Sequence, residues 1–267
     1  MTKLSISKAW DEAKVIIAGN LSLLSTVALA LFVLPGVIGD LVTPQTPAGK
    51  LPEVGYWTVV TAIAVLVTLI GQLAIIGLTL GSGQTVGEAI AHGARRAPAY
   101  IAATLLWMLP FVLVVTVLAG SVVGKPEQAS LPAALGLLLL AAAMLVVAVR
   151  MLMTAPVASA EALGPIEILK RSWALTRGNW WRLFGFLLLF ILAALILVIA
   201  VGSVVGLVAG MVFGELEPFT IGTLLVSLVG QMLSASAVVV FMVILARLYA
   251  QLAGAGEAVA SVPSSGT

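Results

Sequence analysis

The chain has 267 residues, of which 61% are hydrophobic and only 9% are charged, and its formal net charge is +2. Soluble domains carry about 25% charged residues, so this composition excludes a soluble globular protein and indicates an integral membrane protein. The chain has no cysteine and a single histidine, which excludes disulfides, thiolate metal sites and His-rich metal clusters. We expect no metal centre and no cofactor, and no motif points to nucleic acid as a partner.

The N-terminal segment predicts an amphipathic helix on the membrane surface. In SISKAWDEAKVIIAGN, residues 5–20, apolar and charged side chains fall on opposite helical faces, and Gly19-Asn20 ends the pattern. A cleaved signal peptide is the alternative, because Ala28-Leu29-Ala30 follows an apolar stretch. The segment carries acids as well as lysines and is long for the charged start of a signal peptide, which favours the surface helix.

Two apolar runs follow, Leu21–Leu41 and Tyr56–Leu80, and each is long enough to cross a bilayer. Gln72 lies within the second run, where an amide without a hydrogen-bond partner is costly. We therefore expect Gln72 to point inward, where it either bonds to another helix or lines a polar substrate site.

A second surface helix is predicted to begin at Thr85, because Thr85 and Glu88 have the spacing of a capping box. Arg95 and Arg96 lie on its polar face, and we expect Pro98 to break the helix before the next span.

The third and fourth spans are predicted over residues 99–123 and 131–155. Arg150 lies about one turn inside the cytoplasmic end of the fourth span, where arginines usually reach toward the lipid headgroups. Two alternatives are that Arg150 holds an anionic headgroup, or that it pairs with Glu161 inside the bundle.

The clearest pattern is AEALGPIEILKRSWALTRGNWWRLFGFLLLF, residues 160–190, which predicts a third surface helix followed by a span. Pro165 suits a first helical position, and Gly178-Asn179 is a helix stop. Basic residues oppose Trp and Leu, as in helices that lie in a bilayer interface. We name the basic and aromatic residues expected to bind lipid headgroups or a partner the collar: Arg95, Arg96, Lys170, Arg171, Trp173, Arg177, Trp180, Trp181 and Arg182.

The fifth apolar run, Leu183–Phe213, is longer than a hydrocarbon core of about 30 Å requires, so we expect it to tilt or to extend beyond the lipid. Gly202, Gly206 and Gly210 form a stripe of small residues on this run, which permits close helix packing. Such stripes are frequent in membrane helices, so we favour packing within the chain over dimerisation.

The sixth run covers residues 219–250 and contains Gln231 and Arg247. We expect Gln231, like Gln72, to point inward, where it bonds to another helix or lines a polar substrate site. Arg247, like Arg150, is expected to reach toward the lipid headgroups, with headgroup binding or pairing with Glu161 as the alternatives. Residues 254–267 are small and polar, which predicts a flexible C-terminal tail.

The three surface helices begin at intervals of 80 residues, at Ser5, Thr85 and Pro165. Each precedes two spans, so the sequence predicts a threefold repeat. The predicted fold is an all-α integral membrane domain, residues 1–253, with six transmembrane helices in three hairpin repeats, each preceded by a cytoplasmic interfacial amphipathic helix. The repeat units cover about residues 5–80, 85–155 and 165–250.

All lysines and arginines except Lys50 and Lys125 fall on the side of the surface helices. The positive-inside rule therefore predicts that the surface helices and both termini lie in the cytoplasm.

The motif of residues 156–186 resembles the membrane domain of the glycerophosphoryl diester phosphodiesterase family and related bacterial six-span membrane proteins of unassigned function. The closing segment ARLYAQLAG, residues 246–254, also resembles the end of such a domain. The resemblance implies a fold and a bacterial inner-membrane location. The family's chemistry belongs to a separate soluble barrel, so we expect this chain not to be an enzyme. The matching residues are Pro156, Glu161, Gly164, Arg171-Ser172-Trp173, Leu175-Thr176 and Gly178-Asn179-Trp180.

Two functions remain open on these observations. The first is a non-catalytic membrane scaffold or accessory protein that engages anionic lipids, a membrane partner or a second copy through the collar. The second is a transporter or export component for a lipid, peptide or small solute. A mid-membrane cavity lined by Gln72 and Gln231 would favour transport, whereas tight packing throughout would favour the scaffold.

Overall fold

The computed structural model describes residues 4–44, 54–81, 84–123, 131–214 and 220–260, and the side chains of 117–123, 131–134 and 255–260 are not described. The described part is entirely helical, and six of its helices are long and apolar enough to cross a membrane. The prediction of an all-helical chain with six long apolar helices is therefore confirmed. The predicted outer turns with Lys50 and Lys125 lie outside the described residues. The six spans are Leu21–Val42, Tyr56–Leu80, Val86–Thr116, Leu135–Ala160, Trp180–Phe213 and Ile221–Gly254.

The first unit follows the predicted order of a short amphipathic helix and two spans. Pro35 has no amide hydrogen to give to the preceding turn, and the helix widens into a five-residue π-helix just before it. The second span has the predicted bounds. The elements are α1 (Ile6–Gly19), α2 (Leu21–Ala28), η1 (Leu29–Val33), α3 (Leu34–Val42) and α4 (Tyr56–Leu80).

The second unit differs from the prediction in two places. Helix α5 (Val86–Val123) continues through Pro98, so the expected break there is wrong; apolar helices tolerate proline because neighbouring groups satisfy the freed carbonyl. Helix α6 (Leu131–Arg150) ends earlier than expected, and a separate short helix, α7 (Thr154–Ala160), follows it. The capping box is confirmed, since the Thr85 amide donates to Glu88 Oε2 at 2.8 Å.

The third unit contains α8 (Pro165–Thr176), α9 (Trp180–Phe213) and α10 (Ile221–Ala260). The helix stop is confirmed, because Gly178 has a φ of 85°, a conformation that a side chain would strain. Helix α10 extends to Ala260, so residues 254–260 of the predicted tail are helical, and the rest of that tail lies outside the described residues.

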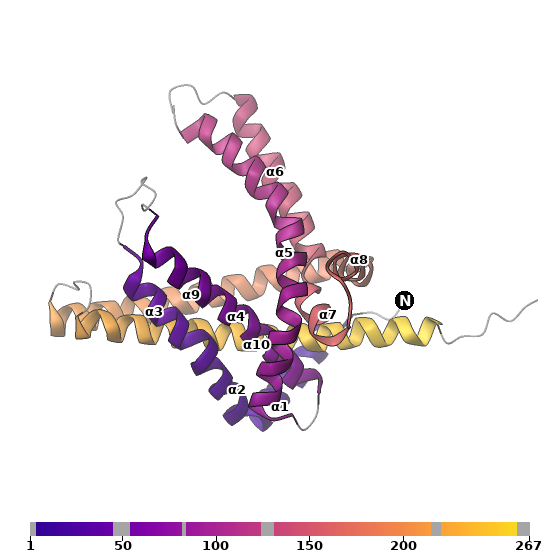
Figure 1. The fold of residues 1–267 in the computed structure, drawn as a ribbon, viewed down its shortest axis with the longest axis horizontal. Helices are drawn as coiled ribbons and strands as arrows, with labels where there is room; N and C mark the ends of the chain where they lie inside the picture. Colours follow the sequence, from indigo (N-terminus) through magenta and orange to yellow (C-terminus); the bar gives the residue numbers. More distant parts are fainter. Residues whose placement is uncertain (1–3, 45–53, 82–83, 124–130, 215–219, 261–267) are drawn as a thin grey trace, which may run out of the picture.

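Three long helices meet at one region, which we call the base. In Figure 1, α4, α5 and α10 cross near α7, and the α5–α6 and α9–α10 pairs point away from that region in different directions. Helix α8 is seen almost end-on there, so it runs crosswise to these helix pairs. This crosswise course suits a helix on a membrane surface, although that placement and the threefold repeat stay predictions.

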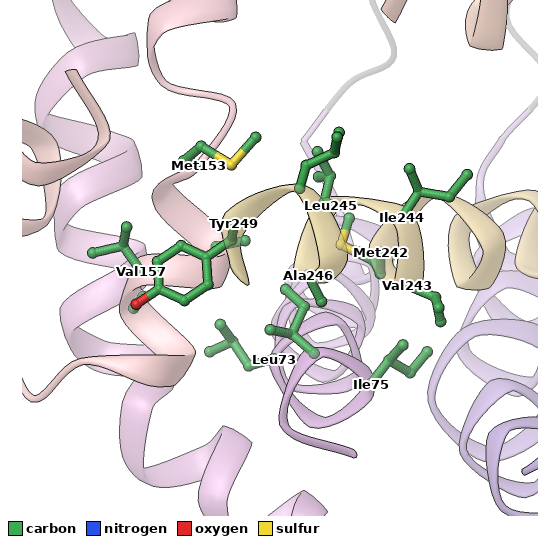
Figure 2. Close-up of a cluster of buried hydrophobic side chains, with 14 of the residues drawn as sticks. Leu73, Ile75, Met153, Val157, Met242, Val243, Ile244, Leu245, Ala246 and Tyr249 are labelled. Atoms are coloured by element: carbon green, nitrogen blue, oxygen red, sulfur yellow. The ribbon is translucent and has the colours of Figure 1, made fainter. Parts of the chain in front are cut away.

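The hydrophobic core lies at the base. Leu73 and Ile75 of α4 are fully buried beneath the stretch of α10 from Met242 to Ala246 (Figure 2). Met153, just before α7, and Val157, within α7, belong to the same cluster and lie on the side where α10 carries Tyr249. Burial at this end fixes the positions of α8 and of the start of α9, which carry most of the collar.

The small-residue stripe of α9 meets no neighbouring helix among the residues that the structure describes. A Cβ atom added at Gly202, Gly206 or Gly210 would meet no atom within 4 Å. The expectation that these glycines bring another helix of the same chain close is therefore not met in the described residues, and packing between copies stays a prediction.

Candidate functional site

Helix α8 is held to the base by a small polar face that the sequence pattern did not reveal. Ile168, Ser172, Leu175 and Thr176 are its buried residues. The Ser172 hydroxyl donates to the carbonyl oxygen of Arg150 at 2.8 Å; the Thr176 hydroxyl lies 3.3 Å from the same oxygen but 3.0 Å from the carbonyl oxygen of Ser172. The Ser172 bond satisfies an open carbonyl at the end of α6, which anchors α8 beside that helix.

The exposed side of α8 combines apolar and basic residues. Ile166, Lys170, Trp173 and Arg177 follow one another at helical spacing, and all four are exposed. Ile166 and Trp173 therefore face away from the bundle, whereas Leu169 on the same helix is half-buried and packs against the core. A surface of this kind suits the boundary between lipid tails and headgroups.

Most of the collar's cations carry uncompensated charge. Arg171 Nε lies 2.9 Å from Glu161 Oε1. The other collar cations form no ion pair with any residue that the structure describes, and each is exposed or half-buried. They are Arg95, Arg96, Lys170, Arg177 and Arg182.

The two tryptophans at the start of α9 have different environments. Trp180 stacks on Phe184, with ring centroids 5.1 Å apart, and its Nε1 donates to the carbonyl oxygen of Val146 in α6 at 3.4 Å. Trp181 is 76% exposed. Trp180 therefore packs within the fold, whereas Trp181 presents its ring to the surroundings.

The ion pairs of the base join different helices, and one alternative considered for Arg150 is not met. Arg247 Nε pairs with Glu12 Oε2 at 2.7 Å, which ties α10 to α1. Arg150 does not pair with Glu161; its guanidinium lies 5.2 Å from the ring centre of Trp173, a cation–π contact. Glu161 instead accepts from Arg171 and from the Tyr249 hydroxyl. Partner choice depends on the crossing of helices, which spacing along the chain does not reveal.

Gln72 and Gln231 line the same cavity. The cavity has a volume of about 360 Å³ and lies between α3, α4 and α10. The Gln231 amide donates to Asp40 Oδ2 at 2.9 Å, and the Ser227 hydroxyl donates to the same oxygen at 2.6 Å. Thr61 also lines the cavity, and its buried hydroxyl oxygen has no hydrogen-bond partner among the described residues.

Asp40 is a site residue that the sequence analysis missed. It is the only charged residue in the first apolar run, and an ionisable residue within a membrane span is a functional candidate by default. That signal was available from the sequence. Its partners were not, because Ser227 and Gln231 come from the other end of the chain.

The second half of the chain matches a known family of membrane domains. The sequence model for the membrane domain of glycerophosphoryl diester phosphodiesterase matches residues 127–261, which is half of the chain. This chain belongs to that membrane-domain family. No curated protein and no solved structure matches it.

The family match includes α8, the start of α9 and all of α10, so most of the collar lies in the matched region of this phosphodiesterase membrane domain. Together with the six apolar helices, it makes the chain a multi-pass membrane protein. Among the described residues, no three His, Cys, Asp or Glu side chains are grouped to hold a metal ion.

Proposed function

We propose that this membrane domain is a non-catalytic scaffold or accessory protein of a bacterial inner membrane, with both termini in the cytoplasm. It engages anionic lipid headgroups or a membrane partner through the collar. One observation carries the proposal: α8 presents Lys170, Trp173 and Arg177 on an exposed face, and neither cation has an ion-pair partner among the described residues.

The energetic argument is electrostatic. A basic residue near an anionic membrane surface contributes about 1 kcal/mol of attraction. Arg171 contributes less to this attraction because Glu161 compensates its charge. Lys170 and Arg177 keep their full charge beside exposed Trp173 and Ile166, whose apolar surfaces favour the same depth in the bilayer.

Replacing Lys170 and Arg177 together with glutamine is expected to lower the affinity of the purified protein for phosphatidylglycerol about 30-fold, because two contributions of about 1 kcal/mol are removed. Native mass spectrometry during titration with phosphatidylglycerol, and separately with phosphatidylcholine, measures this change. The matched control is Lys8→Gln with Lys14→Gln, which removes the same charge from lysines that already pair with Glu12 and Asp11. If both double variants lose the same affinity for phosphatidylglycerol, or if neither loses any, the collar is not the lipid contact.

A second candidate function, transport of a small polar solute, is favoured by the cavity that Gln72 and Gln231 line. A carboxylate, a free hydroxyl and two amides converge there between apolar helices, which is the polar arrangement expected of a substrate path. Transport requires that water reach this cavity.

Cysteine labelling tests this requirement directly, because the natural chain has no cysteine. Thr68→Cys places a thiol on the wall of the cavity, and Ile63→Cys places one on the exposed apolar side of the same helix. Because a thiol reacts as a thiolate and needs water to ionise, we expect a membrane-impermeant thiol reagent added outside the cell to modify only the first variant. No modification of Thr68→Cys would exclude this transport path.

A further inference from the structure

A long apolar groove runs between α9 and α10 and reaches the collar residues Trp181 and Arg182 at one end. Its volume is about 750 Å³, and α1 closes one end of it. The groove is deep because small residues line it: Gly185, Ala193 and Ala194 from α9, and Ser236 and Ala237 from α10.

A packed aromatic cluster adjoins the groove, which Phe186 and Phe190 line. Phe186 of α9 stacks on Phe241 of α10, with ring centroids 6.0 Å apart, and Phe190 lies 4.9 Å from the same ring. These rings hold α9 and α10 together beside the groove. The hollow next to them is therefore a built feature of the helix pair rather than a gap between separated helices.

The end of the groove next to α1 is polar. Trp10 and Asp11 of α1 and Trp181 and Arg182 of α9 line it there. The Asp11 carboxylate lies 2.9 Å from the Lys14 ammonium, which compensates its charge. Arg182 forms no ion pair within the described part of the chain, so this end of the groove offers one uncompensated positive charge, and Trp10 and Trp181 line the same groove.

We propose that the groove binds one acyl chain of a phospholipid, with the phosphate of that lipid on Arg182. This deepens the proposed function, on which it rests, by placing a single lipid in a defined position. The walls are apolar along their length, which suits a hydrocarbon chain, and the free guanidinium suits a phosphate by charge and by hydrogen-bonding geometry.

The length of the groove fits the same occupant. From Arg182 to Leu197, which both line it, α9 rises about 22 Å at about 1.5 Å per residue. The 34 residues of α9 rise about 51 Å in all, compared with a hydrocarbon core of about 30 Å, so α9 tilts or extends beyond the lipid. When α9 is tilted, the groove covers the depth of about one leaflet, which is the depth that one acyl chain occupies.

Photo-crosslinking tests this lipid site. The full chain is reconstituted into nanodiscs that contain phosphatidylglycerol with a diazirine in one acyl chain, and the labelled peptides are mapped. We expect the label on the α9 and α10 residues of the groove. Gly185→Leu fills the groove without strain, since a Cβ there meets no atom within 4 Å, and is expected to abolish that label. Gly202→Leu, on the same helix and outside the groove, is the matched control.

Arg182→Gln is expected to reduce the groove label about five-fold, because one phosphate contact is lost. Lys8→Gln removes the same charge from a lysine that pairs with Glu12 and does not line the groove, so it is expected to leave the label unchanged. An even label along all exposed helices would show annular lipid only and would overturn the site. Exclusion of lipid together with dimeric masses in native mass spectrometry would also overturn it, because a second copy would then fill the groove. Either result leaves the collar test with Lys170 and Arg177 standing, so the two proposals fail separately.

Discussion

Replacing Gly93 with leucine is expected to destabilise the protein by about 3 kcal/mol or more, because overpacking at a backbone contact forces two helices apart. A Cβ at Gly93 of α5 would lie 2.6 Å from the carbonyl oxygen of Ile70 and 3.2 Å from the amide nitrogen of Ala74. Both atoms belong to the backbone of α4 and cannot turn away as a side chain can. The α4–α5 contact is central to the base, so we expect the loss to spread to the whole fold.

Thermal unfolding of the detergent-purified protein, followed by circular dichroism, measures the effect of the Gly93 change. Gly87→Leu is the matched control, because it lies on the same helix and a Cβ there meets no atom within 4 Å. The control variant is expected to unfold at or above the temperature of the natural protein, since leucine favours helix over glycine. Equal unfolding temperatures for both variants would contradict the close approach of α4 and α5.

Glu161→Ala is expected to destabilise the fold by about 2 to 3 kcal/mol. Its Oε1 accepts from Arg171 Nε at 2.9 Å and from the Tyr249 hydroxyl at 2.8 Å, so one carboxylate joins the segment after α7 to α8 and α10. Breaking a fully buried pair costs about 3 to 5 kcal/mol, and this one is partly exposed, with 25% of the Glu161 side chain accessible.

A double-mutant cycle with Arg171→Ala isolates the ion pair from other effects of the two changes. Denaturant unfolding of both single variants and the double variant is expected to give a coupling energy of about 1 kcal/mol. Additive effects would mean that the pair contributes nothing and that the loss in Glu161→Ala arises from the Tyr249 contact alone.

Local patterns were sufficient for much of the helical layout. The bounds of Tyr56–Leu80 followed from apolar length alone, and the break at Gly178 followed from helix-stop residues. Pro98 misled the prediction, because proline breaks helices in water but is tolerated where apolar surroundings maintain the remaining backbone hydrogen bonds. The separate helix α7 also escaped prediction, since its residues continue an apolar run without a break in composition.

Chain composition and basic-residue placement established a six-span membrane protein and located the residues of the collar, since hydrophobic length and charge are properties of each segment. Which charges remain free, and which polar groups meet, depended on how the helices cross. Arg247 pairs with Glu12, Asp40 meets Gln231, and the α9–α10 groove opens beside α1. Each of these contacts joins residues from distant parts of the chain, and only the packing of the hairpins at the base brings them together.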